Sequence, residues 1–362
     1  MKGRGSEVFP RSASRNFWCA TYTGGGAYQE YTYDADGRLT RADDTQIGVT
    51  THRAYTFDGN SNRTGLTTTV DDVGGGDPSV VETGYTYDSA DRLTTAGTVY
   101  DAFGRTTTQA DGAQNTYYAN DLVRQITANS ERTTWTLDAA GRLASWTEED
   151  QAENGTWSTT ATKTNHYGAD GDSPDWIAEG NGGITRALKD LSDNLIATTS
   201  ADGDVVLQLA NLHGAIGTRI PLVDDTTPVV NSYDEYGNAL PGTDPSRYGW
   251  LGAEQRSAET PSRVTLMGVR LYDPGTGRFL STDPVHGGGA NAYGYPADPV
   301  NLYDLDGRKV QAKYNKNSRS CSFWHGRCTI KLSRVRAWKA SWNIIGGATA
   351  WGVPHRLPAN QE

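Results

Sequence analysis

The residues whose types could do chemistry gather in one stretch of this chain, from Arg270 to Gly307. It carries two arginines and several aspartates: Arg270, Arg278, Asp273, Asp283, Asp298, Asp304 and Asp306. Two carboxyl groups that share one proton can cleave a peptide bond, because the ionised one activates water while the protonated one donates to the carbonyl. Aspartates in Asp-Pro and Asp-x-x-Gly are also common turn formers. The residue types therefore leave peptide cleavage and turn formation both open.

Other catalytic or ligand-binding patterns are weak. The segments Asp34-Ala-Asp-Gly37 and Asp170-Gly-Asp172 look like fragments of calcium loops, but neither has a Glu at the twelfth position. The six histidines are scattered without metal-ligand spacing, and no phosphate loop, serine nucleophile elbow or dinucleotide fingerprint is present. We therefore expect neither a cofactor nor a metal.

The composition favours strands and turns over helices. The chain has 362 residues, enough for a large core and more than one domain, but only 36 % of them are hydrophobic. It holds 19 Tyr, 10 Trp and 42 Gly. Aromatic residues fit a pleated sheet, while Gly and Asp supply turns.

The ends of the chain differ in charge from one another. The net charge is −10, yet the tail from Gln311 onward holds nine Lys and Arg against the single acid Glu362, so the residues before it carry −18. The N-terminus lacks the apolar run of a secretion signal, and no stretch approaches the roughly 20 apolar residues of a spanning helix. We expect neither a signal peptide nor a transmembrane helix in this chain, and a secreted or cell-surface location reached through a larger system.

A Tyr-Asp motif recurs along the chain. Tyr31-Thr-Tyr-Asp-Ala-Asp-Gly-Arg-Leu-Thr40 is followed by related copies beginning at Tyr55, Tyr85, Tyr100, Trp135 and Tyr233. In Asp34-Ala-Asp-Gly37 an Asp opens a four-residue turn and a Gly closes it, which predicts a hairpin. One hairpin cannot bury an apolar face in water, whereas stacked copies can. The repeat therefore predicts a continuous, spiralling antiparallel sheet.

These repeats, together with the segment 270–307, resemble the YD-repeat or Rhs (rearrangement hot spot) family. The resemblance covers about residues 20 to 308 and includes Tyr272-Asp-Pro-x-x-Gly-Arg-Phe279, Asp283-Pro284, Asn291-x-Tyr293 and Asp298-Pro-Val-Asn301. Members of the family, like teneurins and toxin-complex C subunits, form a hollow shell of spiralling β-sheet. The family's shells enclose a toxic C-terminal segment and end in a self-cleaving, aspartyl-protease-like core. With few repeats, this chain corresponds to the last part of such a shell.

The resemblance implies that Asp283 and Asp304 are the catalytic pair, supported by Arg278 and Arg270, with Asp273, Asp298 and Asp306 as rivals. Relatives are cut just after an Asp-Pro-x-Gly-Leu element. This chain has Asp304-Leu-Asp-Gly-Arg308 there, which places the cleavage region at Gly307, Arg308 and Lys309. Any enzyme activity is expected to be at most this cis-acting autoproteolysis.

The basic tail has its own patterns. Cys321 and Cys328 could form a local disulfide, or bind zinc together with His325. From Leu332 to Ile345, apolar residues at helical spacing alternate with basic ones, which predicts a cationic amphipathic helix. Such a helix could lie on a membrane, bind nucleic acid or form part of the core of a small domain. The tail holds no Asp, so nuclease chemistry has little support and nucleic acid is not expected as a partner.

The predicted fold is therefore all-β. It comprises an irregular segment 1–20, a partial YD-repeat shell 21–250, an Rhs core 251–308, and a small, basic, partly helical segment 309–362. The predicted function is that of a polymorphic toxin, a secreted effector of interbacterial competition that releases its cargo by cleavage near Arg308. Its expected partners are an immunity protein, secretion machinery or a missing upstream shell, and a target-cell membrane. The alternatives are a non-proteolytic, teneurin-like scaffold for proteins or glycans, and a degenerate fragment.

Overall fold

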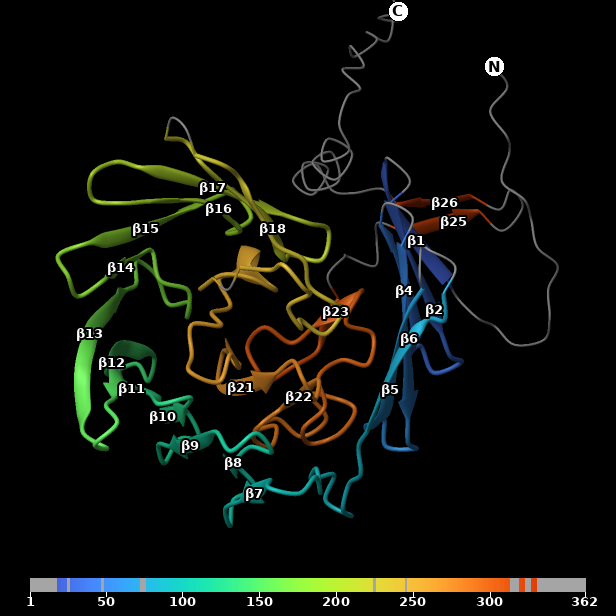
Figure 1. Ribbon diagram of the computed structural model, residues 1–362, viewed down its shortest axis with the longest axis horizontal. Coiled ribbons are helices and arrows are strands. Elements are labelled where there is room, and N and C mark those ends of the chain that lie inside the picture. Colours follow the sequence, from blue (N-terminus) through green and yellow to red (C-terminus); the bar gives the residue numbers. More distant parts are fainter. Residues whose placement is uncertain are drawn as a thin grey trace, which may run out of the picture.

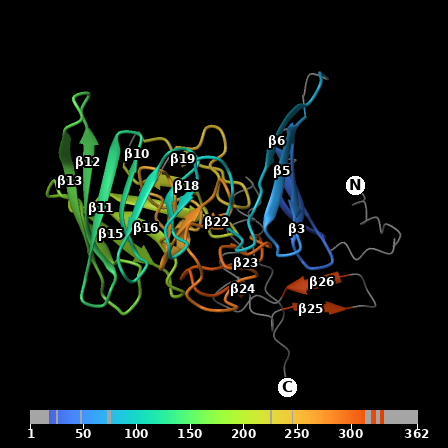
Figure 2. The ribbon, with the colours of Figure 1, turned by 90° about the horizontal axis from the view of Figure 1, so that it is seen from below.

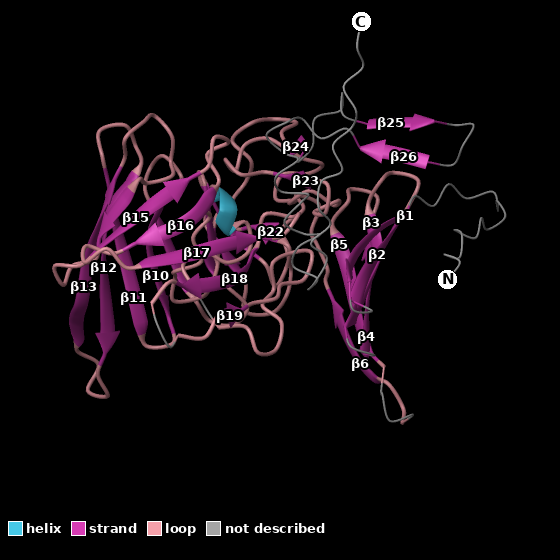
Figure 3. Cartoon of the chain, turned by 90° about the horizontal axis from the view of Figure 1, so that it is seen from above, coloured by secondary structure: helices cyan, strands magenta, loops and turns pink. Residues whose placement is uncertain are grey.

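The computed structural model consists of antiparallel strands with one short 3-10 helix, η1 (Gly252–Glu254), among the residues that it describes (Figure 3). These are residues 18–24, 27–46, 49–71, 76–223, 226–244, 246–312, 319–322 and 327–330. Side chains are described from Tyr28 to Ala312 within those ranges. The prediction of an all-β fold is confirmed. The predicted helix 332–345 lies outside the described residues.

Two sheets follow each other along the chain, and in both the strand order equals the sequence order. The first has six strands: β1 (Trp18–Gly24), β2 (Ala27–Tyr33), β3 (Leu39–Gln46), β4 (Val49–Phe57), β5 (Arg63–Val70) and β6 (Ser79–Gly84). The second has thirteen: β7 (Val99–Tyr100), β8 (Thr106–Thr108), β9 (Gln114–Tyr117), β10 (Val123–Ala128), β11 (Glu131–Leu137), β12 (Leu143–Gln151), β13 (Trp157–His166), β14 (Trp176–Ala178), β15 (Ile184–Lys189), β16 (Leu195–Thr199), β17 (Val205–Ala210), β18 (Ile216–Pro221) and β19 (Val229–Val230).

The second sheet curves around one side of the segment that follows it, and the first sheet stands on the other side (Figures 1 and 2). The enclosed segment carries β20 (Thr265–Met267), β21 (Arg270–Asp273) and β22 (Arg278–Phe279), and then β23 (Leu302–Tyr303) paired with β24 (Gln311–Ala312). Further along, β25 (Arg319–Ser322) pairs with β26 (Arg327–Ile330). The repeats thus form a partial β-shell around an inner segment, which we call the core segment (residues 250–310).

The Tyr-Asp motif forms the predicted turn by a hydrogen-bond pattern that repeats. The Asp34 Oδ1 accepts the N–H groups of Asp36 and Arg38 at 3.0 and 2.9 Å, while its Oδ2 accepts the Arg38 Nε–H at 2.7 Å. Gly37, with φ of 80°, donates to the Asp34 carbonyl and closes the turn. The turns of Asp88, Asp101 and Asp138 have the same bonds. These aspartates are therefore turn residues.

Aromatic side chains from shell and core segment pack together where the two meet. Tyr272, in the core segment, is fully buried, and its ring lies 4.7 Å from that of Tyr295 and 5.1 Å from that of Trp250. Tyr31 and Tyr55 of the first sheet belong to the same buried cluster. Each inner aromatic removes a large apolar area from water, which stabilises the contact between shell and core segment.

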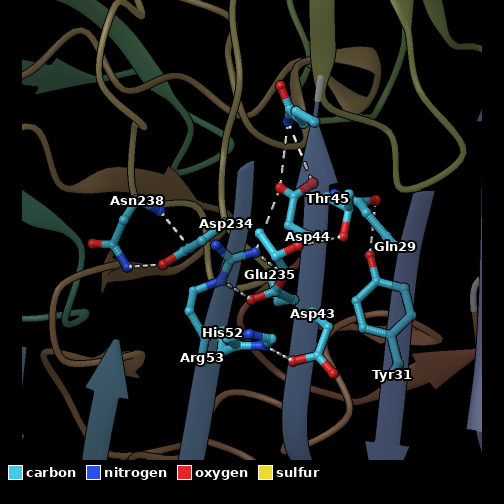
Figure 4. A network of polar contacts seen from close by, with 12 residues as sticks. Gln29, Tyr31, Asp43, Asp44, Thr45, His52, Arg53, Asp234, Glu235 and Asn238 are labelled. Carbon is cyan, nitrogen blue, oxygen red and sulfur yellow. Dashed lines mark hydrogen bonds and ion pairs between the residues drawn. The ribbon is translucent and has the colours of Figure 1, made fainter. Parts of the chain in front are cut away.

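A buried ion pair joins the first sheet to the turn that follows β19 (Figure 4). Arg53 on β4 donates to both carboxylate oxygens of Glu235, at 2.9 and 2.7 Å, and the Tyr55 hydroxyl donates to the same carboxylate at 2.7 Å. Both charged side chains are only 3 % exposed. Burial alone would raise the pKa of Glu235. The charge of Arg53 and the hydrogen bonds to the carboxylate hold this pKa below its ordinary value.

We predict that Arg53→Met lowers the free energy of unfolding by about 3–5 kcal/mol, because it leaves the Glu235 charge buried and unpaired. Arg53→Met combined with Glu235→Gln should recover part of this loss. The matched control is Arg41→Met on β3, whose arginine is 46 % exposed and pairs with Asp43. It should cost less than about 1 kcal/mol. Urea denaturation measures all three, and equal losses at positions 41 and 53 would contradict the prediction.

Candidate functional site

Two glycine turns hold the chain segments that form the candidate site. Gly268 lies in the turn between β20 and β21 with φ of 61°, and a Cβ there would lie 2.3 Å from the Asp306 carbonyl oxygen. Gly307 has φ of 64°, and its Cβ would lie 2.6 Å from the Met267 carbonyl oxygen. The Val269 N–H donates to the Asp306 carbonyl at 3.1 Å. Only glycine allows this close approach of the turn 304–307 to the start of β21.

Arg270, at the start of β21, lies between two carboxyl groups. Its Nη2 is 2.9 Å from Asp304 Oδ2 and 3.2 Å from Asp283 Oδ2. The side chains of Arg270 and Asp304 are 1 % exposed and that of Asp283 is 6 % exposed. The guanidinium also lies 3.6 Å from the centre of the Phe279 ring. One buried cation therefore serves two buried carboxyls, a charge balance that favours one proton on the carboxyls.

The pKa of Asp304 reflects this arrangement. Burial raises the pKa of Asp304 to about 6, the Arg270 charge opposes the rise, and a hydrogen bond with the Asp306 carboxyl adds to it. Burial also lowers the pKa of Arg270, against the influence of the two carboxylates. Asp304 can therefore carry a proton near neutral pH, as a general acid must.

The peptide bond between Arg308 and Lys309 lies at these carboxyls. The Lys309 N–H donates to Asp304 Oδ1 at 3.1 Å, and the Arg308 N–H donates to the same oxygen at 3.0 Å. The carbonyl of Arg308 points to the other side. A Cβ on Gly288 would lie 2.1 Å from this carbonyl oxygen and 2.7 Å from Asp283 Oδ2, so both oxygens border the small space at Gly288.

The segment on the Arg308 side of this peptide bond borders a cavity. A cavity of about 370 Å³ lies between the second sheet and the core segment, and its lining includes Gly268, Asp306 and Arg308. The volume suffices for several waters, and the lining offers them polar partners. The arrangement thus brings together a carboxyl with a raised pKa, a second carboxyl and a peptide bond, with a cavity on the Arg308 side, and these are components of peptide hydrolysis.

The structure places the predicted supporting residue Arg278 away from the candidate site. Arg278 donates to Asn62 Oδ1 at 2.9 Å and to the Asp91 carbonyl, and its guanidinium lies 4.4 Å from the Tyr87 ring centre. It therefore links the core segment to the first repeats, whereas Arg270 contacts both Asp283 and Asp304.

Two of the rival aspartates act in turns. Asp273 accepts the Gly275 N–H and the Thr276 hydroxyl, while Asp298 accepts bonds from Asn301. The third rival, Asp306, lies in the candidate site. Its Oδ1 accepts the N–H groups of Arg308 and Lys309 at 3.0 and 3.2 Å.

Sequence reasoning missed Gly288. Gly288 is buried, and its carbonyl accepts the Val310 N–H at 3.0 Å. The available signal was the run of three glycines, 287–289, directly after Asp283-Pro284. Such a run permits backbone to approach backbone closely.

The pairing of β25 with β26 places Cys321 opposite Cys328. Their side chains and His325 lie outside the described residues, so the disulfide stays a prediction. Within the described part of the chain, no group of three or more His, Cys, Asp or Glu could hold a metal ion, and no helix has the length and apolar character to cross a membrane.

Comparison with known proteins identifies the fold. No family model and no curated protein matches the sequence. The crystal structure of TcdB2-TccC3 is similar with 19 % identity and a TM-score of 0.60, over 78 % of this chain and 16 % of that chain. The crystal structure of TcdB2-TccC3-Cdc42 is similar with 19 % identity and a TM-score of 0.60, over 78 % of this chain and 15 % of that chain. A Photorhabdus luminescens Tc holotoxin pore with a mutated TccC3 is similar with 18 % identity and a TM-score of 0.60, over 79 % of this chain and 15 % of that chain.

At these identities the comparison shows a shared fold, that of the YD-repeat shell in Tc toxin chains. The chain spans about 15 % of the length of the chains that it matches. The structural neighbours thus agree with the family resemblance in the fold.

We predict that Asp304 makes stability depend on pH in a specific direction. Because the pKa of Asp304 is raised from 3.8 to about 6, its proton stabilises the fold fully below pH 3.8, and this contribution is lost as pH rises through 6. The loss should reach about 3 kcal/mol at most. Asn cannot titrate, so Asp304→Asn should remove it.

The measurement is urea denaturation between about pH 4.5 and 7.5 in full-length chains carrying Asp283→Asn, which leaves Asp304 as the only carboxyl beside Arg270. The turn variant Asp298→Asn is the control and should keep the pH dependence. Identical pH slopes with and without Asp304→Asn would refute the assignment.

Proposed function

We propose that this chain is the C-terminal part of an Rhs-type toxin shell that cleaves its own backbone between Arg308 and Lys309. One observation carries the proposal. The Arg308–Lys309 peptide has its N–H on Asp304 and its carbonyl beside the space shared with Asp283, and Arg270 contacts both carboxyls. The family resemblance implies the same two aspartates and the same region of the chain.

The reaction divides the work between the two aspartates. Asp283, as carboxylate, takes a proton from water while the water oxygen bonds to the Arg308 carbonyl carbon. Asp304, which holds its proton because of burial, gives that proton to the Lys309 nitrogen as the carbon–nitrogen bond breaks. The products are a carboxyl group on Arg308 and an amine on Lys309. Solvent exchange then moves a proton from Asp283 back to Asp304.

Tethering supplies much of the rate. The scissile peptide is held on both sides of the bond, since the Val310 N–H donates to the Gly288 carbonyl and the Arg308 N–H donates to Asp304. A reaction within one chain needs no substrate binding, so the entropy of bringing the groups together has been spent during folding. The activity proposed is accordingly a single turnover in cis.

The released segment, 309–362, would be the cargo, and the repeats 21–250 with the core 251–308 its carrier. The similar structures contain TcdB2 with TccC3, and one also contains Cdc42. Because this chain spans about 15 % of such chains, we propose that further shell strands or a secretion partner complete it. An immunity protein that binds the basic segment, and a target-cell membrane, remain the partners that its composition suggests.

Intact mass spectrometry of the purified chain tests the proposal. Wild-type protein should give two masses that sum to the full chain plus one water, split between Arg308 and Lys309. Asp283→Asn and Asp304→Asn should each lower the cleavage rate by at least about 100-fold. Asp273→Asn, which keeps a turn acceptor, is the matched control and should cleave normally. A single full-length mass for every chain would favour the non-proteolytic scaffold.

Gly288→Ala offers a second test that leaves both carboxyls in place. The added methyl would occupy the space beside the Arg308 carbonyl and Asp283, so the scissile carbonyl must shift. We expect cleavage to slow by about 100-fold, because small displacements in an active site are costly. The control is Gly287→Asn, where an added Cβ meets no atom within 4 Å and Asn tolerates the positive φ of 75°. Equal rates for Gly288→Ala and wild type would remove Gly288 from the site.

A further inference from the structure

We propose that Asp306 is a third catalytic carboxyl of this site: it forms a pair with Asp304 that holds one proton and delivers it to the Lys309 nitrogen. This inference rests on the proposed self-cleavage. It adds a residue at the variable position of the Asp-Pro-x-Gly-Leu element, where the family pattern requires no particular side chain.

Four contacts carry the inference. The Arg308 N–H lies 3.0 Å from Asp304 Oδ1 and 3.0 Å from Asp306 Oδ1. The Lys309 N–H lies 3.1 Å from the first oxygen and 3.2 Å from the second. Two carboxyl oxygens thus share the same two donors. The two carboxyls therefore lie beside each other, and a hydrogen bond with the Asp306 carboxyl adds to the rise in the pKa of Asp304 that burial causes.

The two carboxyls of the pair have different surroundings. Asp304 Oδ2 faces Arg270 from β21, beyond which lies Asp283, and Tyr295 lies close enough for its pKa to be affected by Asp304. Asp306 faces the cavity between shell and core segment. Charged groups that line this cavity with it are Arg142, Asp170, Asp172, Arg247, Arg256, Glu259 and Arg308. Arg256 pairs with Asp172, and Arg247 pairs with Glu259.

This difference gives each carboxyl a task. Asp304 is buried and bound to Arg270, whereas Asp306 is partly exposed beside the cavity. The proton can therefore enter from solvent through Asp306 and be held between the two carboxyls. In the reaction it bonds to the Lys309 nitrogen while the Arg308–Lys309 bond breaks, which leaves the pair fully ionised until a solvent proton replaces it.

The backbone keeps Asp306 in this position. Its carbonyl accepts the Val269 N–H at 3.1 Å, and its Cα would lie 2.6 Å from a Cβ on Gly268. A change of the Asp306 side chain therefore need not move the turn. This makes a conservative substitution informative about chemistry.

The test is the pH dependence of the cleavage rate in the full chain. The Asp306→Asn variant keeps an acceptor for the two N–H groups but cannot ionise. Because the neighbouring carboxyl is gone, Asp304 should lose its proton at lower pH. Asp306→Asn should move the alkaline limb of the rate profile down by about one pH unit, which lowers the rate near neutral pH by about tenfold. At lower pH its rate should approach that of wild type. Asp298→Asn, another turn aspartate, should leave the limb unchanged.

A second readout does not require cleavage. In chains carrying Asp283→Asn, the Asp304 carboxyl can be titrated by its ¹³C chemical shift, and Asp306→Asn should lower its pKa. One outcome is that the wild-type chain cleaves, but Asp306→Asn shifts neither the alkaline limb of the rate profile nor the pKa of Asp304. This outcome would overturn the Asp304–Asp306 pair and leave the proposed self-cleavage standing. Another outcome is that Asp306→Asn lowers the pKa of Asp304, but the wild-type chain does not cleave. This outcome would overturn self-cleavage and proton delivery, and only the proton shared by the two carboxyls would remain. An equal loss of rate at every pH would reduce Asp306 to a structural residue and overturn the inference.

Discussion

The buried guanidinium of Arg270 is the interaction on which the organisation of the core segment depends. It contacts Asp304 at 2.9 Å and Asp283 at 3.2 Å, so it joins β21, the loop after β22 and the turn after β23. A buried charge without a partner costs several kcal/mol, and removing the arginine would leave two carboxyls in that state. The net charge of the three groups then favours a proton on one carboxyl. Burial raises the pKa of Asp304 to about 6 and the Arg270 charge opposes this rise, so the contact that joins the three segments also limits how readily this carboxyl is protonated.

The shell positions this core through the turns of its repeats. Arg278 donates to Asn62, a residue of the Asp58 turn, and the Tyr293 hydroxyl donates to the Gly104 carbonyl in the Asp101 turn. Backbone bonds join Leu39 to Ala297 and Thr106 to Leu280. The core segment is therefore an inward continuation of the shell, and its geometry depends on repeats far away in sequence. The Arg53–Glu235 pair has the same effect, since it holds the first sheet against the turn that follows β19.

Local chemistry was predictable from the sequence, and long-range chemistry was not. The Asp34 turn and its copies follow from residues within five positions, which is why the hairpins and the all-β fold could be expected. The roles of Arg270 and Arg278 could not be separated, because both flank Tyr272 and only the tertiary fold determines that one meets the aspartates and the other meets Asn62. Gly288 was missed because its partner, the Arg308 carbonyl, lies twenty residues away. The division into two sheets likewise had no local signal.

The differences between this chain and the family's cleavage element become understandable when backbone and side-chain contacts are separated. The described contacts around the proposed scissile bond are made by backbone groups: the N–H groups of Arg308 and Lys309 bind carboxyl oxygens, and the Arg308 carbonyl lies at Gly288. The Arg308 side chain is exposed and lines the cavity, so nothing in this geometry requires Leu there. Leu305, at the position of the proline in the family's element, packs against the aromatic cluster. Gly307 is different, because any side chain would collide with the Met267 carbonyl. The proposed self-cleavage therefore relies on the path of the backbone and on the buried charges, and it places no requirement on the side chain of residue 308.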